Sequence, residues 1–206
     1  MRTETPWGPW EPASLAEVAR RFCALHTPWW IAGGYAVELA VGHAFRDHAD
    51  IDVLLLRRDQ LTAQQVLTGW EWWAADPPGT LRPWLPGETL PPHVHDIWCR
   101  PGPGEPWRVQ LMLDEADDDD HWVFRRDPRI RLPLDRLGRV SGDGIPYLVL
   151  QVQLLYKAKS RRPKDDQDFA TALPVLSADQ RAWLTETITL AHGADHPWAV
   201  RLRSQW

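Results

Sequence analysis

The chain has 206 residues and a formal net charge of −5, with 44% hydrophobic and 25% charged residues. This balance is typical of a globular protein that buries a hydrophobic core, and the negative charge disfavours a general nucleic-acid-coating role. Its two cysteines, Cys23 and Cys99, form neither a disulfide framework nor a cysteine-based zinc site. The first thirty residues do not resemble a signal peptide, and no apolar run approaches the roughly 20 residues of a membrane helix. We therefore expect a soluble, cytoplasmic protein with no membrane partner.

The order of the predicted elements divides the chain into three parts. Residues 1–13 contain Trp7, Trp10 and three prolines, which predicts an extended arm that packs on the body. Residues 14–140 mix helical and strand-like segments, whereas residues 141–206 are mostly helical. We predict an α+β fold, in which a core with a short mixed sheet is followed by a small helical C-terminal part.

Capping and breaking residues delimit the individual elements. Ser14 and Glu17 form a capping box at the start of a helix that ends before Pro28. The next segments are an apolar run at 29–32, a helix at 35–41, a strand at 50–56, a helix at 59–67, and strands at 70–74, 95–100 and 107–113. The last segments are an irregular stretch at 121–146 and helices at 148–159, 165–173 and 177–192.

The segment 33–56 carries the strongest chemical signal. Gly33 and Gly34 stand at the start of a helix, where a phosphate can approach backbone N–H groups with the help of the helix dipole. Asp50 and Asp52 begin a buried strand, and side chains two residues apart on a strand share a face. Two carboxylates so placed repel one another unless a cation compensates them, and hard oxygen ligands suit Mg²⁺. Each part alone is common at ordinary turns and strand ends, but the combination predicts a phosphate and Mg²⁺ site.

Residues 33–39, Gly42 and residues 46–53 together resemble the signature of the nucleotidyltransferase superfamily with the DNA polymerase β-like fold. Within it, they are most similar to the aminoglycoside 2″-adenylyltransferase and lincosamide nucleotidyltransferase branch. Tyr35 stands where that branch usually has Trp, and His43 where it often has Arg. The resemblance implies a polymerase β-like core.

The resemblance also implies a reaction, in which an acceptor hydroxyl attacks the α-phosphorus of ATP or a related nucleotide and releases pyrophosphate. Asp50 and Asp52 would be catalytic and would hold Mg²⁺, and Gly33 and Gly34 would cradle the β- and γ-phosphates. A third carboxylate from a neighbouring strand would complete the catalytic and metal-binding set.

Three acids are candidates for this third carboxylate. Asp114 follows the strand predicted at 107–113 and is the first choice, as catalytic residue and metal ligand, with Glu115 in reserve. Asp96, on the preceding strand, is a further alternative. The alternative for the whole acidic run 114–120 is that it is only a solvated loop.

Three basic residues join the candidate nucleotide-binding set. Arg46 can bind a phosphate bidentately or pair with Asp47. His48 can orient a metal-ligating carboxylate through its ring N–H. By resemblance to the antibiotic and toxin-type nucleotidyltransferases, Lys157 would reach a nucleotide phosphate, unless the cluster around it is a solvated basic turn.

The favoured partners are a nucleoside triphosphate and a small hydroxylated acceptor such as an aminoglycoside- or lincosamide-like antibiotic. A toxin-type or regulatory enzyme acting on tRNA or protein is the alternative, and the net negative charge argues against it because nucleic-acid binding depends on neutralising phosphates. The basic residues that keep this alternative open are Arg125, Arg126, Arg129, Arg131 and the cluster at 157–164. A non-catalytic nucleotide-binding module is the second alternative, which the presence of both Asp50 and Asp52 disfavours. We expect a monomer or a homodimer.

Overall fold

The computed structural model describes residues 2–204. The helices are α1 (Leu15–Phe22), α2 (Gly33–Val41), α3 (Thr62–Val66), α4 (Leu150–Ala158), α5 (Pro163–Ala172), α6 (Ala178–His192) and α7 (Pro197–Arg203). The strands are β1 (Trp29–Ala32), β2 (Asp52–Leu56), β3 (Glu71–Ala74), β4 (Arg82–Pro83), β5 (Asp96–Arg100), β6 (Val109–Ala116), β7 (His121–Val123), β8 (Arg131–Pro133), β9 (Gly138–Val140) and β10 (Pro146–Leu148). Single 3₁₀ turns occupy Arg57–Asp59, Leu134–Arg136 and Leu173–Val175. Residue 1 of the predicted arm and residues 205–206 of the predicted helical part lie outside the described residues.

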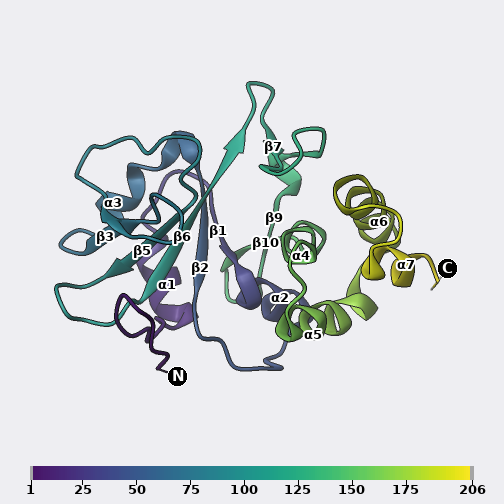
Figure 1. Ribbon diagram of the computed structural model, residues 1–206, viewed down its shortest axis with the longest axis horizontal. Helices are drawn as coiled ribbons and strands as arrows, with labels where there is room; N and C mark the ends of the chain where they lie inside the picture. The colour runs from purple at the N-terminus through teal and green to yellow at the C-terminus, as the bar shows by residue number, and fades with distance from the viewer. Residues whose placement is uncertain (1, 205–206) are drawn as a thin grey trace.

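The strands form one mixed sheet (Figure 1). Its main path follows the order β4-β3-β5-β6-β2-β1-β10-β9, and β7 pairs with β6 and β8 outside this path. At the centre, β2 runs parallel to β6 and antiparallel to β1. This pairing of β2 with β6 decides which side chains meet Asp52.

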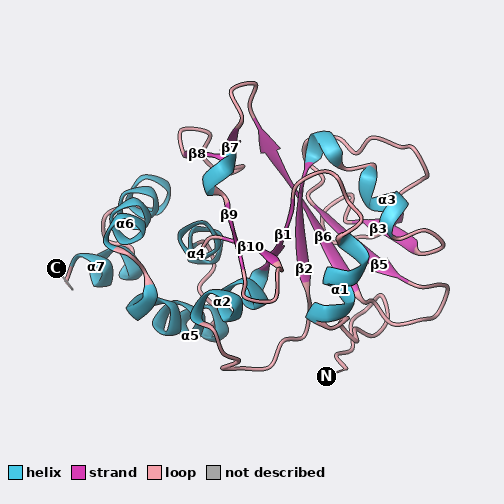
Figure 2. Cartoon of the chain, turned by 180° about the vertical axis from the view of Figure 1, so that it is seen from behind, coloured by secondary structure: helices cyan, strands magenta, loops and turns pink. Residues whose placement is uncertain are grey.

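Helices cover both faces of the sheet, and α4–α7 gather on one side of it (Figure 2). Alternate residues of β2 supply the two hydrophobic cores. Val53 and Leu55 belong to the core that contains α1, whereas Leu54 and Leu56 belong to the core that contains α2 and α4. Because side chains alternate along a strand, Asp52 faces the side that α4 covers.

The architecture is the α+β arrangement predicted from the sequence, with four local corrections. The stretch 121–146, predicted to be irregular, contains β7, β8, β9 and the start of β10. Each of these strands has only three residues, too few for a periodic pattern to show. The strand predicted at 50–56 begins at Asp52, so Asp50 lies in the preceding loop, and α2 begins at Gly33 instead of residue 35. The helix α7 was not predicted.

The N-terminal arm packs on the body through Trp10, which is buried and forms isolated bridges with Thr3 and Trp107. The predicted boundary at residue 140 coincides with the end of β9, and β10 after it pairs with β1 inside the same sheet. Within residues 2–204, no helix is both long and apolar enough to cross a membrane.

The contact between β9 and β1 gives a test of the packing. A Cβ atom at Gly138 would overlap the indole of Trp30, whereas a Cβ atom at Gly142 would meet no neighbouring atom. We expect Gly138→Ala to lower the free energy of unfolding by about 1–3 kcal/mol in urea titrations. Gly142→Ala, the matched control, should leave it unchanged or slightly raised. Equal effects of the two substitutions would contradict this packing.

Candidate active site

One cavity of about 380 Å³ brings together most of the predicted site residues. It lies between the α4-covered face of the sheet and the helices α4 and α5. Its lining residues are Gly33, Asp50, Asp52, Asp96, Gln110, Met112, Arg125, Arg126, Gln153, Tyr156, Lys157, Lys159, Ser160, Arg162 and Asp165. The cavity therefore places acids from the sheet opposite basic residues from the loop after β7 and from the region of α4 and α5.

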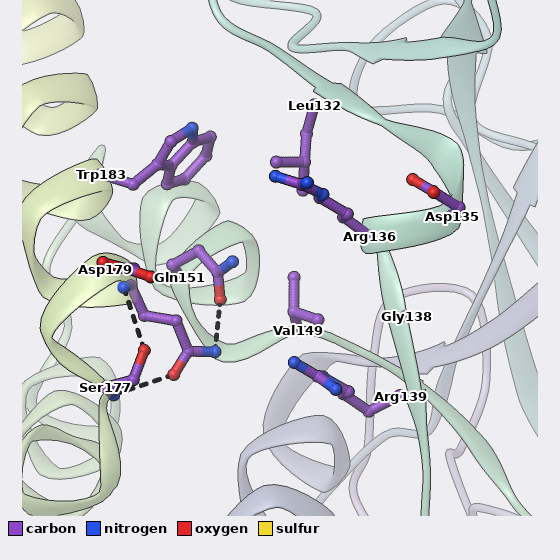
Figure 3. A pocket seen from close by; sticks show the side chains of 11 residues that line it. Leu132, Asp135, Arg136, Gly138, Arg139, Val149, Gln151, Ser177, Asp179 and Trp183 are labelled. Carbon is purple, nitrogen blue, oxygen red and sulfur yellow. Dashed lines mark hydrogen bonds between the residues drawn. The ribbon is translucent and has the colours of Figure 1, made fainter.

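A second cavity, of about 550 Å³, lies on the opposite face of α4. Figure 3 shows Trp183 and Asp179 of α6 on one wall and Arg136 on the facing wall, with Gln151 of α4 below. At 100° per residue, Gln151 points away from the α4 residues that line the first cavity. None of the site residues predicted from the sequence lines this second cavity, so we place the candidate active site in the first.

Gly33 allows α2 to begin directly against Asp52. Its φ of +67° is in the left-handed region, and a Cβ atom here would overlap Oδ2 of Asp52. The N–H of Gly33 donates to Oε1 of Gln153 at 2.8 Å, so this amide is already paired with α4. The first turn of α2 has no side-chain cap, which leaves its other N–H groups directed at the cavity end of the helix.

Asp50 and Asp52 carry uncompensated negative charge. Within residues 2–204, neither carboxylate has a hydrogen bond or an ion pair. Burial, together with the charge of Asp50, raises the pKa of Asp52 to about 7, and the charge of Lys157 only partly opposes this shift. A cation between the two carboxylates would remove this repulsion.

The strand register separates Asp114 from this pair. In the parallel pairing of β2 with β6, Asp52 lies opposite Gln110, and Asp114 lies opposite Leu56. Asp114 is therefore four residues farther along β6, about 13 Å at 3.3 Å per residue. Asp114 lies on the same face of β6 as Gln110, as the alternation of side chains predicts, but it does not line the cavity.

Asp114 and its reserve, Glu115, have other partners. Oδ2 of Asp114 accepts hydrogen bonds from the indole of Trp122 at 2.7 Å and from the hydroxyl of Tyr156 at 2.5 Å. Burial raises the pKa of the Asp114 carboxyl. Glu115 pairs with Arg57 and does not line the cavity either.

Asp96 is the acid that the sheet does bring into the cavity. It lies opposite Met112 in the antiparallel pairing of β5 with β6, and its Oδ1 accepts a hydrogen bond from Nε2 of Gln110 at 3.2 Å. Its charge also contributes to the raised pKa of Asp52. In the described part of the chain no three His, Cys, Asp or Glu side chains are grouped closely enough to hold a metal ion alone. Mg²⁺ typically needs only one or two carboxylates, together with waters and substrate phosphates.

Arg46 and His48 anchor the loop before β2 and do not line the cavity. Nε and Nη2 of Arg46 donate to the two carboxylate oxygens of Asp168 at 2.6 and 2.9 Å. Nδ1 of His48 lies 2.9 Å from Nη1 of Arg46, and its Nε2 lies 2.8 Å from Oε1 of Glu38. Since an arginine only donates, Nδ1 accepts and Nε2 carries the proton toward Glu38. Gly34 permits this packing, because a Cβ atom there would overlap both side chains.

Lys157 lines the cavity but is already paired twice. Its Nζ lies 2.8 Å from Oδ2 of Asp168 and 3.2 Å from Oδ1 of Asp165. Asp165 also accepts a hydrogen bond from Nε of Arg162 at 2.7 Å. A continuous chain of ion pairs thus runs from Arg46 through Asp168, Lys157 and Asp165 to Arg162, and it joins the loop before β2 to α4 and α5.

Several lining residues were not assigned to the site from the sequence. Arg125 and Arg126 lie after β7, in the stretch predicted to be irregular, and were considered only as an RNA-binding surface. Gln110 faces Asp52 only because of the β2–β6 register. The Arg-Arg doublet beside an aromatic residue, Phe124, was the one local signal that could have drawn attention to these arginines.

Comparisons with known proteins identify a matching family model for part of the chain. Residues 14–70, which contain Gly33, Asp50 and Asp52, match the family model of the aminoglycoside-2''-adenylyltransferases. No curated protein sequence is significantly similar to the chain.

Three solved structures share the fold. The lincosamide antibiotic adenylyltransferase LnuA, bound to lincomycin, superposes with a TM-score of 0.55 at 16% identity, over 79% of this chain and 96% of that one. The enzyme ANT(2")-Ia in complex with adenylyl-2"-tobramycin gives a TM-score of 0.54 at 13% identity, over 85% and 95%. Its solution structure gives 0.50 at 14% identity, over 93% and 90%. The chain therefore has the polymerase β-like nucleotidyltransferase fold, and over residues 14–70 it resembles the aminoglycoside 2″-adenylyltransferases, as expected from its sequence.

Proposed function

We propose that the chain is an Mg²⁺-dependent nucleotidyltransferase that moves AMP from ATP onto a hydroxyl of a small molecule, such as an aminoglycoside- or lincosamide-like antibiotic. The observation that carries this proposal is the pair of unpartnered carboxylates, Asp50 and Asp52, of which Asp52 packs against the glycine that begins α2. The family match at residues 14–70 covers the same segment.

The residues of the cavity fit a magnesium ion. Asp50 and Asp52 offer hard oxygen ligands without competing partners, and burial, followed by the negative charge of Asp50, raises the pKa of Asp52. These two residues would hold the metal, and Asp96 would supply the third carboxylate in place of Asp114. When bound, Mg²⁺ neutralises charge on the triphosphate and on the leaving pyrophosphate.

The side chains of the cavity account for the remaining steps. The acceptor hydroxyl attacks the α-phosphorus, the bond to the pyrophosphate breaks, and the hydroxyl proton passes to the Asp96 carboxylate. Gln110, which donates a hydrogen bond to Asp96, would hold that carboxylate in place. The N–H of Gly34 in the uncapped first turn of α2 would bind a phosphate oxygen, since the N–H of Gly33 is paired with Gln153.

The distribution of basic residues supports a small acceptor over tRNA. Arg129 pairs with Asp127 at 2.6 Å, and Arg131 pairs with Asp117 at 2.9 Å. Arg125 and Arg126, the other two arginines of the loop after β7, line the cavity. The four arginines of this loop therefore do not form one unpaired basic surface, the feature that favours RNA binding.

The raised pKa of Asp52 makes the stability of the metal-free protein depend on pH. A carboxyl whose pKa is higher in the folded state favours folding while it is protonated. That contribution is lost as the pH rises from the ordinary pKa of 3.8 through the folded value of about 7. Asp52→Asn should therefore have a free energy of unfolding higher than that of wild type at pH 8, by on the order of 1–3 kcal/mol, and similar to that of wild type near pH 4.

Asp118→Asn, at an exposed position, is the matched control and should leave the stability unchanged both at pH 8 and near pH 4. In addition, Mg-ATP at a hundredfold excess over its dissociation constant should stabilise wild type by about 2.7 kcal/mol and Asp52→Asn by much less. Equal stabilisation of both proteins by Mg-ATP would remove Asp52 from the site.

Asp96 and Asp114 can be separated by substitution. Asp96→Asn should remain folded and lose at least about a hundredfold in turnover, because it removes the proton acceptor. Asp114→Asn should mainly lower the melting temperature, since it weakens two buried hydrogen bonds. Pyrophosphate release with a panel of aminoglycosides and lincosamides, together with melting curves, measures both effects. A folded Asp114→Asn protein without turnover, beside an active Asp96→Asn protein, would restore Asp114 as the third carboxylate.

A further inference from the structure

Two arginines of the cavity, Arg125 and Arg126, take no part in the chemistry described above. Within residues 2–204, Arg125 has no ion pair and no hydrogen bond, and its Nη1 is buried. Arg126 donates a single hydrogen bond, from Nη1 to the main-chain oxygen of Tyr156 at 2.9 Å. Buried donors almost always have an acceptor, so the orphaned nitrogen of Arg125 indicates a missing partner.

The two guanidinium groups are held by one aromatic ring. The Cζ atoms of Arg125 and Arg126 each lie 5.4 Å from the centroid of the Tyr156 ring. The hydroxyl of Tyr156 donates to Asp114, which fixes the ring. Burial, followed by the charge of Arg125, lowers the pKa of Arg126, as expected for two close cations without a directly bonded carboxylate.

Among the other cations that line the cavity, Lys159 has no ion pair within residues 2–204, but as a lysine it lacks the guanidinium fork. Lys157 is engaged by Asp165 and Asp168, and Arg162 is engaged by Asp165. Arg125 and Arg126 therefore offer forked donors that no protein acid occupies. They line the same cavity as the carboxylates that would hold Mg²⁺.

We infer that Arg125 and Arg126 form a clamp for the β- and γ-phosphates of the nucleotide. The inference rests on the proposed function, because it requires a triphosphate in this cavity. A polyphosphate satisfies both sides of the cavity at once, since its oxygens can reach a metal on the acidic side and the two forks on the basic side. The guanidinium fork matches the spacing of phosphate oxygens and binds them bidentately.

A purely structural role for Arg125 makes a different prediction. Its charge opposes the raised pKa of the buried Asp114 carboxyl, so it could serve only to offset that group. In that case, Arg125→Gln would lower stability without changing nucleotide affinity. Affinity measured together with the melting temperature separates the two roles.

The test is calorimetric titration of the full chain with ATP, AMP and inorganic pyrophosphate in the presence of Mg²⁺. The proteins are wild type, Arg125→Gln, Arg126→Gln and Arg125→Lys, with Arg129→Gln as the matched control, because Arg129 lies in the same loop but pairs with Asp127. We expect ATP and pyrophosphate to bind at least about tenfold more weakly to both glutamine variants, and AMP to bind as to wild type. Arg125→Lys keeps the charge but loses the fork. Its affinity for ATP and pyrophosphate should lie between that of wild type and that of the glutamine variants.

Three outcomes overturn the inference. Unchanged ATP and pyrophosphate affinity in the variants would show that the arginines do not contact the phosphates, whatever happens to the melting temperature. An equal loss for AMP and ATP would indicate general damage to the cavity. If wild type binds none of the three ligands with Mg²⁺, the proposed function itself fails, which distinguishes that failure from failure of the clamp alone. Should Arg125→Gln not fold, Arg126→Gln and Arg125→Lys still decide the question.

Discussion

The carboxylate of Asp52 lies directly against the backbone of Gly33, at the point where β2 and α2 meet. No side chain other than hydrogen fits at that position, and the left-handed φ of Gly33 lets α2 begin there. The contact places a half-buried carboxyl group beside the uncapped end of a helix. It also leaves Asp50 and Asp52 without a protein partner, which is costly unless a cation and its ligand enter the cavity. The rest of the cavity is arranged around this charge.

The C-terminal helices are tied to this point by buried ion pairs. Asp168 of α5 accepts from Arg46 and from Lys157, and therefore links the loop before β2 to α4. Such buried pairs add little net stability, because desolvation offsets their attraction, but removing one partner leaves an uncompensated charge. Their effect is to fix the position of α4, which supplies the Tyr156 ring and the Gln153 side chain to the cavity.

Local signals indicated the acids at 50 and 52, which line the cavity, and were insufficient for the rest of the candidate site. The glycines at 33–34 and the aspartates at 50 and 52 lie in one short segment, so their spacing predicted a phosphate and Mg²⁺ site, and the family resemblance of the segment implied the reaction. The choice between Asp96 and Asp114 depended on the register of β6 against β2, which tertiary packing sets and which no local pattern reveals. Arg46, His48 and Lys157 looked available because the acids that pair with two of them, Asp165 and Asp168, are far away in the sequence or on another helix. The short strands after residue 120 could not be seen for a different reason, since each has only three residues, too few for a periodic pattern to show.

The most direct test of the central claim is a crystal structure of the protein grown with a non-hydrolysable ATP analogue and Mg²⁺. The account predicts metal density bound to the carboxylates of Asp50 and Asp52, with the triphosphate between them and the first turn of α2. It also predicts that Asp96, and not Asp114, faces the reacting phosphate. Nucleotide bound in the cavity beside Trp183, or bound without contact to Asp50 and Asp52, would contradict the account.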